Sequence, residues 1–233
     1  MKKIAILCFV VAVILLGIGL CLSIFTKADD NKQDVVKEET EIDVLEKVNR
    51  LENYFTSKIP IGDISKLSNQ EKLNFALFCL NNEEGLSISE DKIKNVLVSY
   101  FGNDLEFKNE NILDLNTQEI IAKYYPKKKK YTYTDVTLDY PDTSLTLLSY
   151  GDYKEEKNTF EVYRQYLFVD ASYNIYSTYQ DYINKTNSLG VYDVSTTNGV
   201  LTSSIVNNYI DILPVVTYSF KKEQNRYVLV SIN

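Results

Sequence analysis

Histidine and tryptophan are absent from this sequence, and cysteine is scarce. Without histidine the chain can build no Ser-His-acid or Cys-His catalytic arrangement, and no zinc or non-haem iron site with an imidazole ligand. Cys8 and Cys21 lie in an apolar run near the N-terminus, which leaves Cys79 alone in the remainder. That remainder can therefore form no internal disulfide and no thiolate cluster, and we expect no cofactor. Cys79 is set among apolar residues and is expected to fill the core.

The chain also lacks the excess of positive charge that a nucleic-acid partner requires. Its formal net charge is -7, and Lys2 and Lys3 precede the apolar run, so the remainder is more acidic still. Affinity for nucleic acid comes mostly from neutralising phosphates. We therefore expect that neither DNA nor RNA is a partner.

Charged residues are missing altogether from one long stretch, Ile4–Phe25. At about 1.5 Å per residue, a helix of this length spans roughly 33 Å, which matches a hydrocarbon core of about 30 Å. The core of a cleaved signal peptide is shorter, about 7–15 residues. We therefore predict a retained transmembrane helix over residues 4–25, with the lipid bilayer as its partner. The alternative is cleavage near Ala28, which would give a secreted protein.

The orientation follows from the basic residues at the N-terminus. Lys2 and Lys3 directly precede the apolar run, and basic residues stay on the cytoplasmic side. Residues 1–3 are accordingly predicted to be cytoplasmic, and everything beyond Phe25 to be extracytoplasmic. The prediction is a single-pass protein of the cell membrane.

Beyond the apolar run the sequence divides into three parts. Residues 26–41 are polar and charged without an apolar period, which indicates a linker. Residues 42–57 read as an amphipathic juxtamembrane helix, ended by Pro60 and Gly62. Its apolar residues recur in steps of four and three, so they share one face. This face either docks onto the following domain or assembles with another subunit; its members are Val44, Val48, Leu51 and Phe55.

Residues 60–233 are predicted to form one extracytoplasmic α+β domain. Two segments of Ser-x-x-Glu form, at 68–71 and 87–90, have the pattern of a capping box and precede apolar stripes of helical period. From Asp104 onward, short runs rich in Tyr, Thr and Ile alternate with turn residues, which is typical of strands. Helices followed by a meander of strands predict helices packed on an antiparallel β-sheet.

Three of these features together resemble a group of uncharacterised proteins. They are the anchor with its charged spacer, the helix that begins Ser68-Asn69-Gln70-Glu71-Lys72-Leu73, and the ending from Pro214-Val215-Val216-Thr217-Tyr218-Ser219-Phe220 to Ile232. The combination is similar to small membrane-anchored, extracytoplasmic proteins of low-GC Gram-positive bacteria. The likeness implies a location and no activity. The final hairpin is also similar to the one that closes many NTF2-like domains, over fewer than twenty residues, and no functional residue is carried over.

A serine–lysine mechanism needs no histidine, and fragments of its motifs are present. Ser89 and Lys92 fit Ser-x-x-Lys, Ser172-Tyr173-Asn174 fits Ser-x-Asn, and Lys185-Thr186-Asn187 half-fits Lys-Thr-Gly. The last two fragments are too close together for the fold of penicillin-recognising enzymes, and the third lacks its glycine. Ser89 is better explained as part of a helix start.

Acidic residues cluster twice in the strand-rich part. Pairs of carboxylates can hydrolyse glycosidic bonds or hold Ca²⁺. A chain with 32 acidic residues also produces such clusters by chance, and there is no tryptophan on which a sugar could stack. An envelope hydrolase is therefore an alternative rather than the main expectation. The two clusters are Asp104, Glu106 and Glu110, and Asp135, Asp139 and Asp142.

Four consecutive lysines, Lys127, Lys128, Lys129 and Lys130, follow Pro126. Each basic residue near an anionic surface contributes about 1 kcal/mol, so the run could contact anionic headgroups or wall polymers. The alternative is a hairpin loop whose lysines discourage pairing at a sheet edge.

These observations predict a membrane-anchored, non-enzymatic binding or interaction module at the cell envelope, with a protein or an envelope polymer as partner. Two alternatives remain: a hydrolase that uses paired carboxylates, and a structural subunit of a membrane complex assembled through the Val44–Phe55 face. Catalytic activity is left open, because the sequence presents no catalytic residue that can be named.

Overall fold

A computed structural model describes residues 38–56, 61–80, 87–134, 146–193 and 203–233. Residues from Glu38 to Asn233 cluster as one unit. The predicted anchor at residues 4–25 lies outside the described ranges. Within those ranges, no helix combines the length and the apolar character that crossing a bilayer would require.

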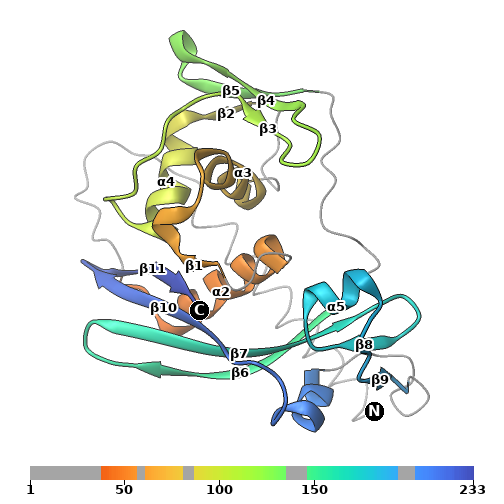
Figure 1. The fold of residues 1–233 in the computed structure, drawn as a ribbon. Coiled ribbons are helices and arrows are strands. Elements are labelled where there is room, and N and C mark those ends of the chain that lie inside the picture. The colour runs from red at the N-terminus through yellow and green to blue at the C-terminus, as the bar shows by residue number, and fades with distance from the viewer. Residues whose placement is uncertain (1–37, 57–60, 81–86, 135–145, 194–202) are drawn as a thin grey trace, which may run out of the picture. The chain divides into compact units, whose positions relative to one another are not determined.

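The fold is α+β, as predicted, with antiparallel sheets and a few helices (Figure 1). The larger sheet curls, and its strands run in the order β1-β11-β10-β7-β8-β9, with β6 on the other side of β7. All of these pairings are antiparallel. The strands are β1 (Gly62–Asp63), β6 (Thr146–Glu155), β7 (Thr159–Val169), β8 (Asn174–Tyr176), β9 (Gly190–Val191), β10 (Val216–Glu223) and β11 (Arg226–Ile232).

A smaller antiparallel sheet has the order β2-β5-β4-β3. Its two central strands, β4 and β5, are joined by a short 3-10 turn, η3 (Pro126–Lys128). The strands are β2 (Ser87–Ser89), β3 (Ile112–Leu113), β4 (Ile120–Tyr125) and β5 (Lys130–Tyr133). Two further 3-10 segments are η2 (Ile64–Lys66) and η5 (Ser203–Tyr209).

The helices are α2 (Glu41–Phe55), α3 (Asn69–Leu80), α4 (Glu90–Phe101) and α5 (Tyr179–Asn184). The predicted capping box of α3 is present, because Ser68 and Glu71 exchange bonds between side chain and backbone N–H. The start of α4 differs from the prediction. Ser87 belongs to β2, and Ser89 caps the helix by accepting a bond from the Lys92 N–H at 3.3 Å. The pairing of β2 with β5 therefore overrides the earlier helix start.

The apolar face of α2 is part of the domain's own core. Val44, Val48 and Leu51 are 0% exposed and Phe55 is 1% exposed. The Phe55 ring stacks on Phe75 of α3 with 5.5 Å between ring centroids. Of the two roles that we left open for this face, docking onto the domain is the one observed. The expectation of an assembly face through these residues is wrong, because no surface there is left for a second subunit.

Strand β7 separates two apolar clusters because its side chains alternate between the two faces of the sheet. Phe160, Val162 and Phe168 belong to the main core with the helices. Leu167 and Val169 point the other way, into a smaller cluster with Val206, Leu213 and other residues from the β8–β9 end. The curl of the larger sheet thus places polar residues of β7 opposite α2, where the buried site described next is found.

Candidate functional site

The most deeply buried carboxyl group among the described residues belongs to Glu52 of α2, which is 5% exposed. Its Oε1 accepts a hydrogen bond of 2.9 Å from the Tyr166 hydroxyl and lies 3.2 Å from the Arg164 Nε. Its Oε2 accepts a longer bond of 3.5 Å from the Ser149 hydroxyl. A further bond of 2.7 Å joins the hydroxyls of Tyr166 and Tyr218. We call these five residues the Glu52 cluster.

The strand registers explain how the cluster is assembled. Arg164 and Tyr166 are two residues apart on β7, so both face α2. Ser149 of β6 pairs with Tyr166, and Gly151 of β6 pairs with Arg164. A Cβ on Gly151 would lie 1.7 Å from the backbone oxygen of Tyr163. Glycine therefore lets the two strands approach closely at the position where the guanidinium turns toward Glu52.

Electrostatics in the cluster are dominated by the loss of water. Burial raises the pKa of Glu52, against the opposing effects of the Arg164 guanidinium and the Tyr166 hydroxyl. Burial also raises the pKa of Tyr166, with Tyr218 and Glu52 acting in the same direction. A carboxyl with a raised pKa is what a general acid needs. Here, however, both carboxyl oxygens already accept bonds from protein groups, which is how a structural polar network is built.

A second buried charge, Lys47, lies on the same helix and is 7% exposed. Its ammonium contacts the Glu39 carboxylate at 2.7 Å and donates to the backbone oxygens of Ser99 and Tyr227, each at 2.8 Å. Burial lowers the pKa of Lys47, and the Glu39 carboxylate opposes that shift. The three N–H groups of the ammonium thus have three acceptors, so its hydrogen-bonding capacity is used in joining elements of the fold.

The predicted lysine run lies in the β4–β5 connection, as a hairpin loop. Lys127, Lys128 and Lys129 are exposed, and Lys130 begins β5 half-buried. Lys129 adopts a left-handed backbone conformation, with φ 47° and ψ 48°. The loop is thus displayed at the surface, which is what a contact with an anionic partner requires.

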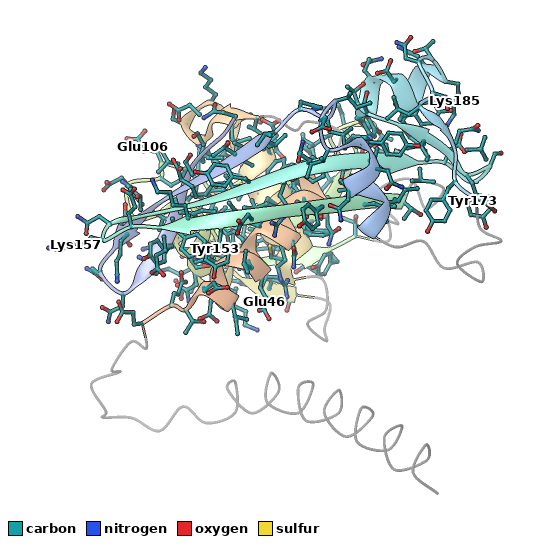
Figure 2. All side chains as sticks on the ribbon, turned by 90° about the horizontal axis from the view of Figure 1, so that it is seen from below. Glu46, Glu106, Tyr153, Lys157, Tyr173 and Lys185 are labelled. Carbon is teal, nitrogen blue, oxygen red and sulfur yellow. The ribbon has the colours of Figure 1, made fainter. Side chains whose placement is uncertain are left out.

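The acidic clusters predicted from the sequence are not gathered into a site within the described ranges. Asp104 and Glu106 are exposed, the latter at the surface in Figure 2. Glu110 instead accepts hydrogen bonds from Asn69 at 2.7 Å and Gln70 at 2.9 Å, which fixes the 108–113 segment to α3. The second cluster, Asp135, Asp139 and Asp142, lies outside the described residues.

Other sequence candidates take structural roles. Ser89 caps α4, whereas Lys185 lies after α5 with its ammonium 4.0 Å from the centroid of the Tyr182 ring. Figure 1 places α4 and α5 in different regions of the fold, so the serine–lysine fragments do not converge. Burial raises the pKa of the Cys79 thiol to about 11, which suits a core residue. Among the described residues, no group of three or more acidic or cysteine side chains is placed to hold a metal ion.

The Glu52 cluster was missed in the sequence, although one signal was available. Glu52 stands four residues after Val48 and next to Leu51, so it lies on the apolar face of its helix. A charged residue on such a face requires a buried partner. The partners lie 97 and 114 residues away at Ser149 and Tyr166, and no local pattern indicates them.

No family model, no curated protein and no solved structure matches this chain. The functional argument below therefore depends on the residues themselves.

Proposed function

We propose that this protein is a single-pass, membrane-tethered module whose folded domain lies on the extracytoplasmic side and acts by binding rather than by catalysis. The observation that carries the proposal is the uncharged run Ile4–Phe25. It is long enough to cross lipid and longer than a signal-peptide core. The small membrane-anchored proteins that the chain resembles would share this location.

The described domain supports a binding role in one specific way. Its two buried charged networks, around Lys47 and Glu52, are occupied by bonds between protein groups. Such networks hold the helices and strands in place, and their polar groups are already bonded to other protein groups rather than open to a substrate. Recognition would then fall to exposed loops carried by this scaffold.

Membrane retention is tested by extraction of the full chain from isolated membranes at alkaline pH. The wild-type chain is expected to stay in the pellet and to be released only by detergent. The variant with Leu15→Arg and Leu16→Arg is expected in the soluble fraction, because each arginine at the centre of a span costs about 2.5–3.5 kcal/mol. Gln33→Arg, in the predicted linker, is the control and should behave as the wild type. A wild-type chain released without detergent would overturn the proposal.

The side of the membrane is tested separately with reporters fused after Asn233. Alkaline phosphatase is expected to be active there, and a reporter that works only in the cytoplasm is expected to be inactive. The reverse result would refute the orientation while leaving the anchor intact. A shortened chain in the medium, beginning near Asp29, would instead identify the secreted alternative.

A further inference from the structure

The strongest local concentration of charge in the domain is the hairpin loop Pro126–Lys130, here called the lysine loop. The stretch from Ile120 to Thr134 contains five lysines and no acidic residue, in a chain whose formal net charge is -7. The fifth lysine, Lys123, lies on β4 with its ammonium 5.7 Å from the centroid of the Tyr125 ring. Five of the 25 basic residues of an acidic protein therefore lie in one hairpin that contains no acidic residue.

Protection of a sheet edge explains this concentration only in part. Lysines on an edge strand prevent pairing with other chains. In the smaller sheet, however, the order β2-β5-β4-β3 makes β4 and β5 the inner strands. The lysine loop joins these two inner strands and stands at one end of the sheet. Beside it, β2 pairs with β5 from Lys130 to Thr132, whereas β3 pairs with β4 only at Ile120 and Ala122.

Among the described residues, few acidic side chains compensate the charges of the loop. Lys129 has one acidic neighbour, with its ammonium 3.7 Å from the Glu90 carboxylate and 76% of its side chain exposed. Within the described ranges, Lys127, Lys128 and Lys130 form no ion pair with an acidic side chain. Four ammonium groups close in sequence, of which only that of Lys129 has an acidic neighbour, repel one another, and an anionic ligand would relieve that repulsion.

The loop is also held in place. The backbone oxygen of Lys129 accepts a hydrogen bond of 3.0 Å from the Glu90 N–H, and the Glu90 carboxylate accepts another from the Tyr124 hydroxyl. Lys130 pairs with Ser89 across β5 and β2. A loop fixed from two sides loses little backbone entropy when a ligand binds, which favours a recognition role.

The lysine loop and the first described residues, Glu38 and Glu39, lie at opposite ends of α4. Helix α4 has its first residue, Glu90, at the loop, and its twelve residues extend about 18 Å from there. Its other end lies beside the start of the described domain, because Lys47 bridges Ser99 of α4 and Glu39. Figure 1 shows the smaller sheet and the β10–β11 hairpin on opposite sides of α4. The lysine loop is therefore separated by about the length of α4 from Glu38 and Glu39, where the described part of the chain begins.

From this geometry we propose that the lysine loop binds a linear anionic polymer of the cell envelope, such as a chain of phosphodiesters, rather than the headgroups of the tethering bilayer. The stretch holds no arginine, so it lacks a guanidinium that could bind one phosphate or carboxylate with two hydrogen bonds. Its lysines offer compact single charges instead. Point charges suit a partner with repeated negative charge. The location of this polymer in the envelope rests on the proposed membrane tether, but binding to the polymer can be measured whether or not the tether exists.

The test uses the full chain in neutral dodecyl maltoside micelles and a fluorescently labelled poly(glycerol phosphate), followed by anisotropy. The loop variant carries Lys→Gln at 127, 128, 129 and 130. The control variant carries Lys→Gln at the exposed positions 66, 94, 108 and 157, of which Lys157 stands at the β6–β7 turn in Figure 2. Both variants change the formal net charge from -7 to -11.

The loop variant is expected to bind at least about 25-fold more weakly than the wild type, since two engaged lysines at about fivefold each give that factor. The control variant should stay within about threefold, and the wild-type affinity should fall steeply with added salt. Equal losses in both variants, or no binding by the wild type, would overturn the proposal.

A second arm separates the polymer from the membrane surface. The same three proteins are mixed with vesicles of phosphatidylcholine alone and with 30% phosphatidylglycerol. Loop-dependent binding to anionic vesicles without binding to the polymer would overturn the proposal in favour of headgroups. Because the polymer arm is run in detergent solution, its outcome is independent of whether the chain is retained in membranes.

Discussion

Glu52 is kept inside the domain by Arg164 and by hydroxyl groups that replace the water it has lost. Moving an ion out of water costs several kcal/mol even after the protein relaxes, and the attraction between the partners offsets much of that cost. The Arg164 side chain is 13% exposed, so neither partner can recover hydration alone. The pair therefore contributes little net stability while it is complete, and its separation is costly.

Glu52→Leu is expected to lower the free energy of unfolding by about 3 kcal/mol, because it leaves a buried guanidinium without its carboxylate. The double variant Glu52→Leu with Arg164→Met removes both charges and should recover most of that loss. Urea unfolding of the full chain in neutral detergent, followed by circular dichroism, measures both. A double variant no more stable than Glu52→Leu alone would show that the two charges are not coupled.

Gly151 is required by space rather than by backbone conformation. A Cβ there would lie 1.7 Å from the backbone oxygen of Tyr163, an atom that cannot swing away as a side chain can. We expect Gly151→Ala to lower the free energy of unfolding by at least about 3 kcal/mol, since β6 and β7 must separate. Gly62→Ala is the contrast: φ is +79° and no heavy atom lies within 4 Å, so only the backbone strain of about 1–2 kcal/mol applies. Equal effects in urea unfolding would contradict the steric argument.

At the level of elements, the Lys47 ammonium joins three pieces of the fold. It contacts Glu39 just before α2, the last turn of α4 at Ser99, and β11 at Tyr227. Glu39 also accepts a bond of 2.8 Å from the Tyr227 N–H. The residues that precede α2 are thus fastened to the final strand by one carboxylate.

Glu39→Gln removes the charge of this carboxylate but keeps its size. The expected loss is about 2 kcal/mol in the free energy of unfolding, in the range for charged hydrogen bonds to buried groups. Glu46→Gln makes the same change on the exposed side of α2, where Figure 2 labels Glu46, and should cost no more than about 0.5 kcal/mol. Thermal and urea unfolding compare the two. If both variants unfolded like the wild type, the tie would have no energetic role.

Local sequence patterns predicted those helices and strands whose signals lie within the segment itself. The Ser68–Glu71 capping box and the apolar face of α2 were visible because helix signals lie within four residues. The strands expected beyond Asp104 include the run rich in Ile and Tyr that forms β4. Leu105–Phe107, in the same part of the sequence, forms no strand, and the two-residue strand β1 was not foreseen. Such short segments become strands only when a distant partner, here β11, is in place.

For the whole molecule, features formed by residues close in sequence could be predicted, and features that bring distant residues together could not. The lysine run Lys127–Lys130 was apparent because its charges are consecutive. Its location at the end of two inner strands could not be predicted, because the inner position of β4 and β5 depends on the strand order. The Glu52 cluster combines α2, β6, β7 and β10. Glu52 bonds to Ser149 and Tyr166, which lie 97 and 114 residues away, and Tyr166 bonds to Tyr218, a further 52 residues on. Local periodicity and the order of helical and strand-like segments predicted the fold class, whereas the strand order determines which polar residues meet.

The same topology buries tyrosines in a way that makes the domain sensitive to alkali. Burial raises the pKa of Tyr100, Tyr131, Tyr166 and Tyr218 above the ordinary value near 10. Below that pH these hydroxyls are neutral in both states and contribute no pH dependence. Above it the unfolded chain releases protons that the folded chain retains, so stability falls as the pH rises.

Each such tyrosine lowers the free energy of unfolding by about 1.4 kcal/mol per pH unit above pH 10. Four of them would remove a typical stability of about 5–15 kcal/mol within about one to three units. We therefore expect cooperative unfolding between about pH 11 and 13, seen as simultaneous loss of near-ultraviolet circular dichroism and rise of tyrosinate absorbance at 295 nm. Tyr166→Phe keeps the ring and removes one ionising group, so its transition should be less steep. Full ionisation of every tyrosine while the near-ultraviolet signal persists would mean that these hydroxyls are open to water, and the packing of the curled sheet against α2 would have to be revised.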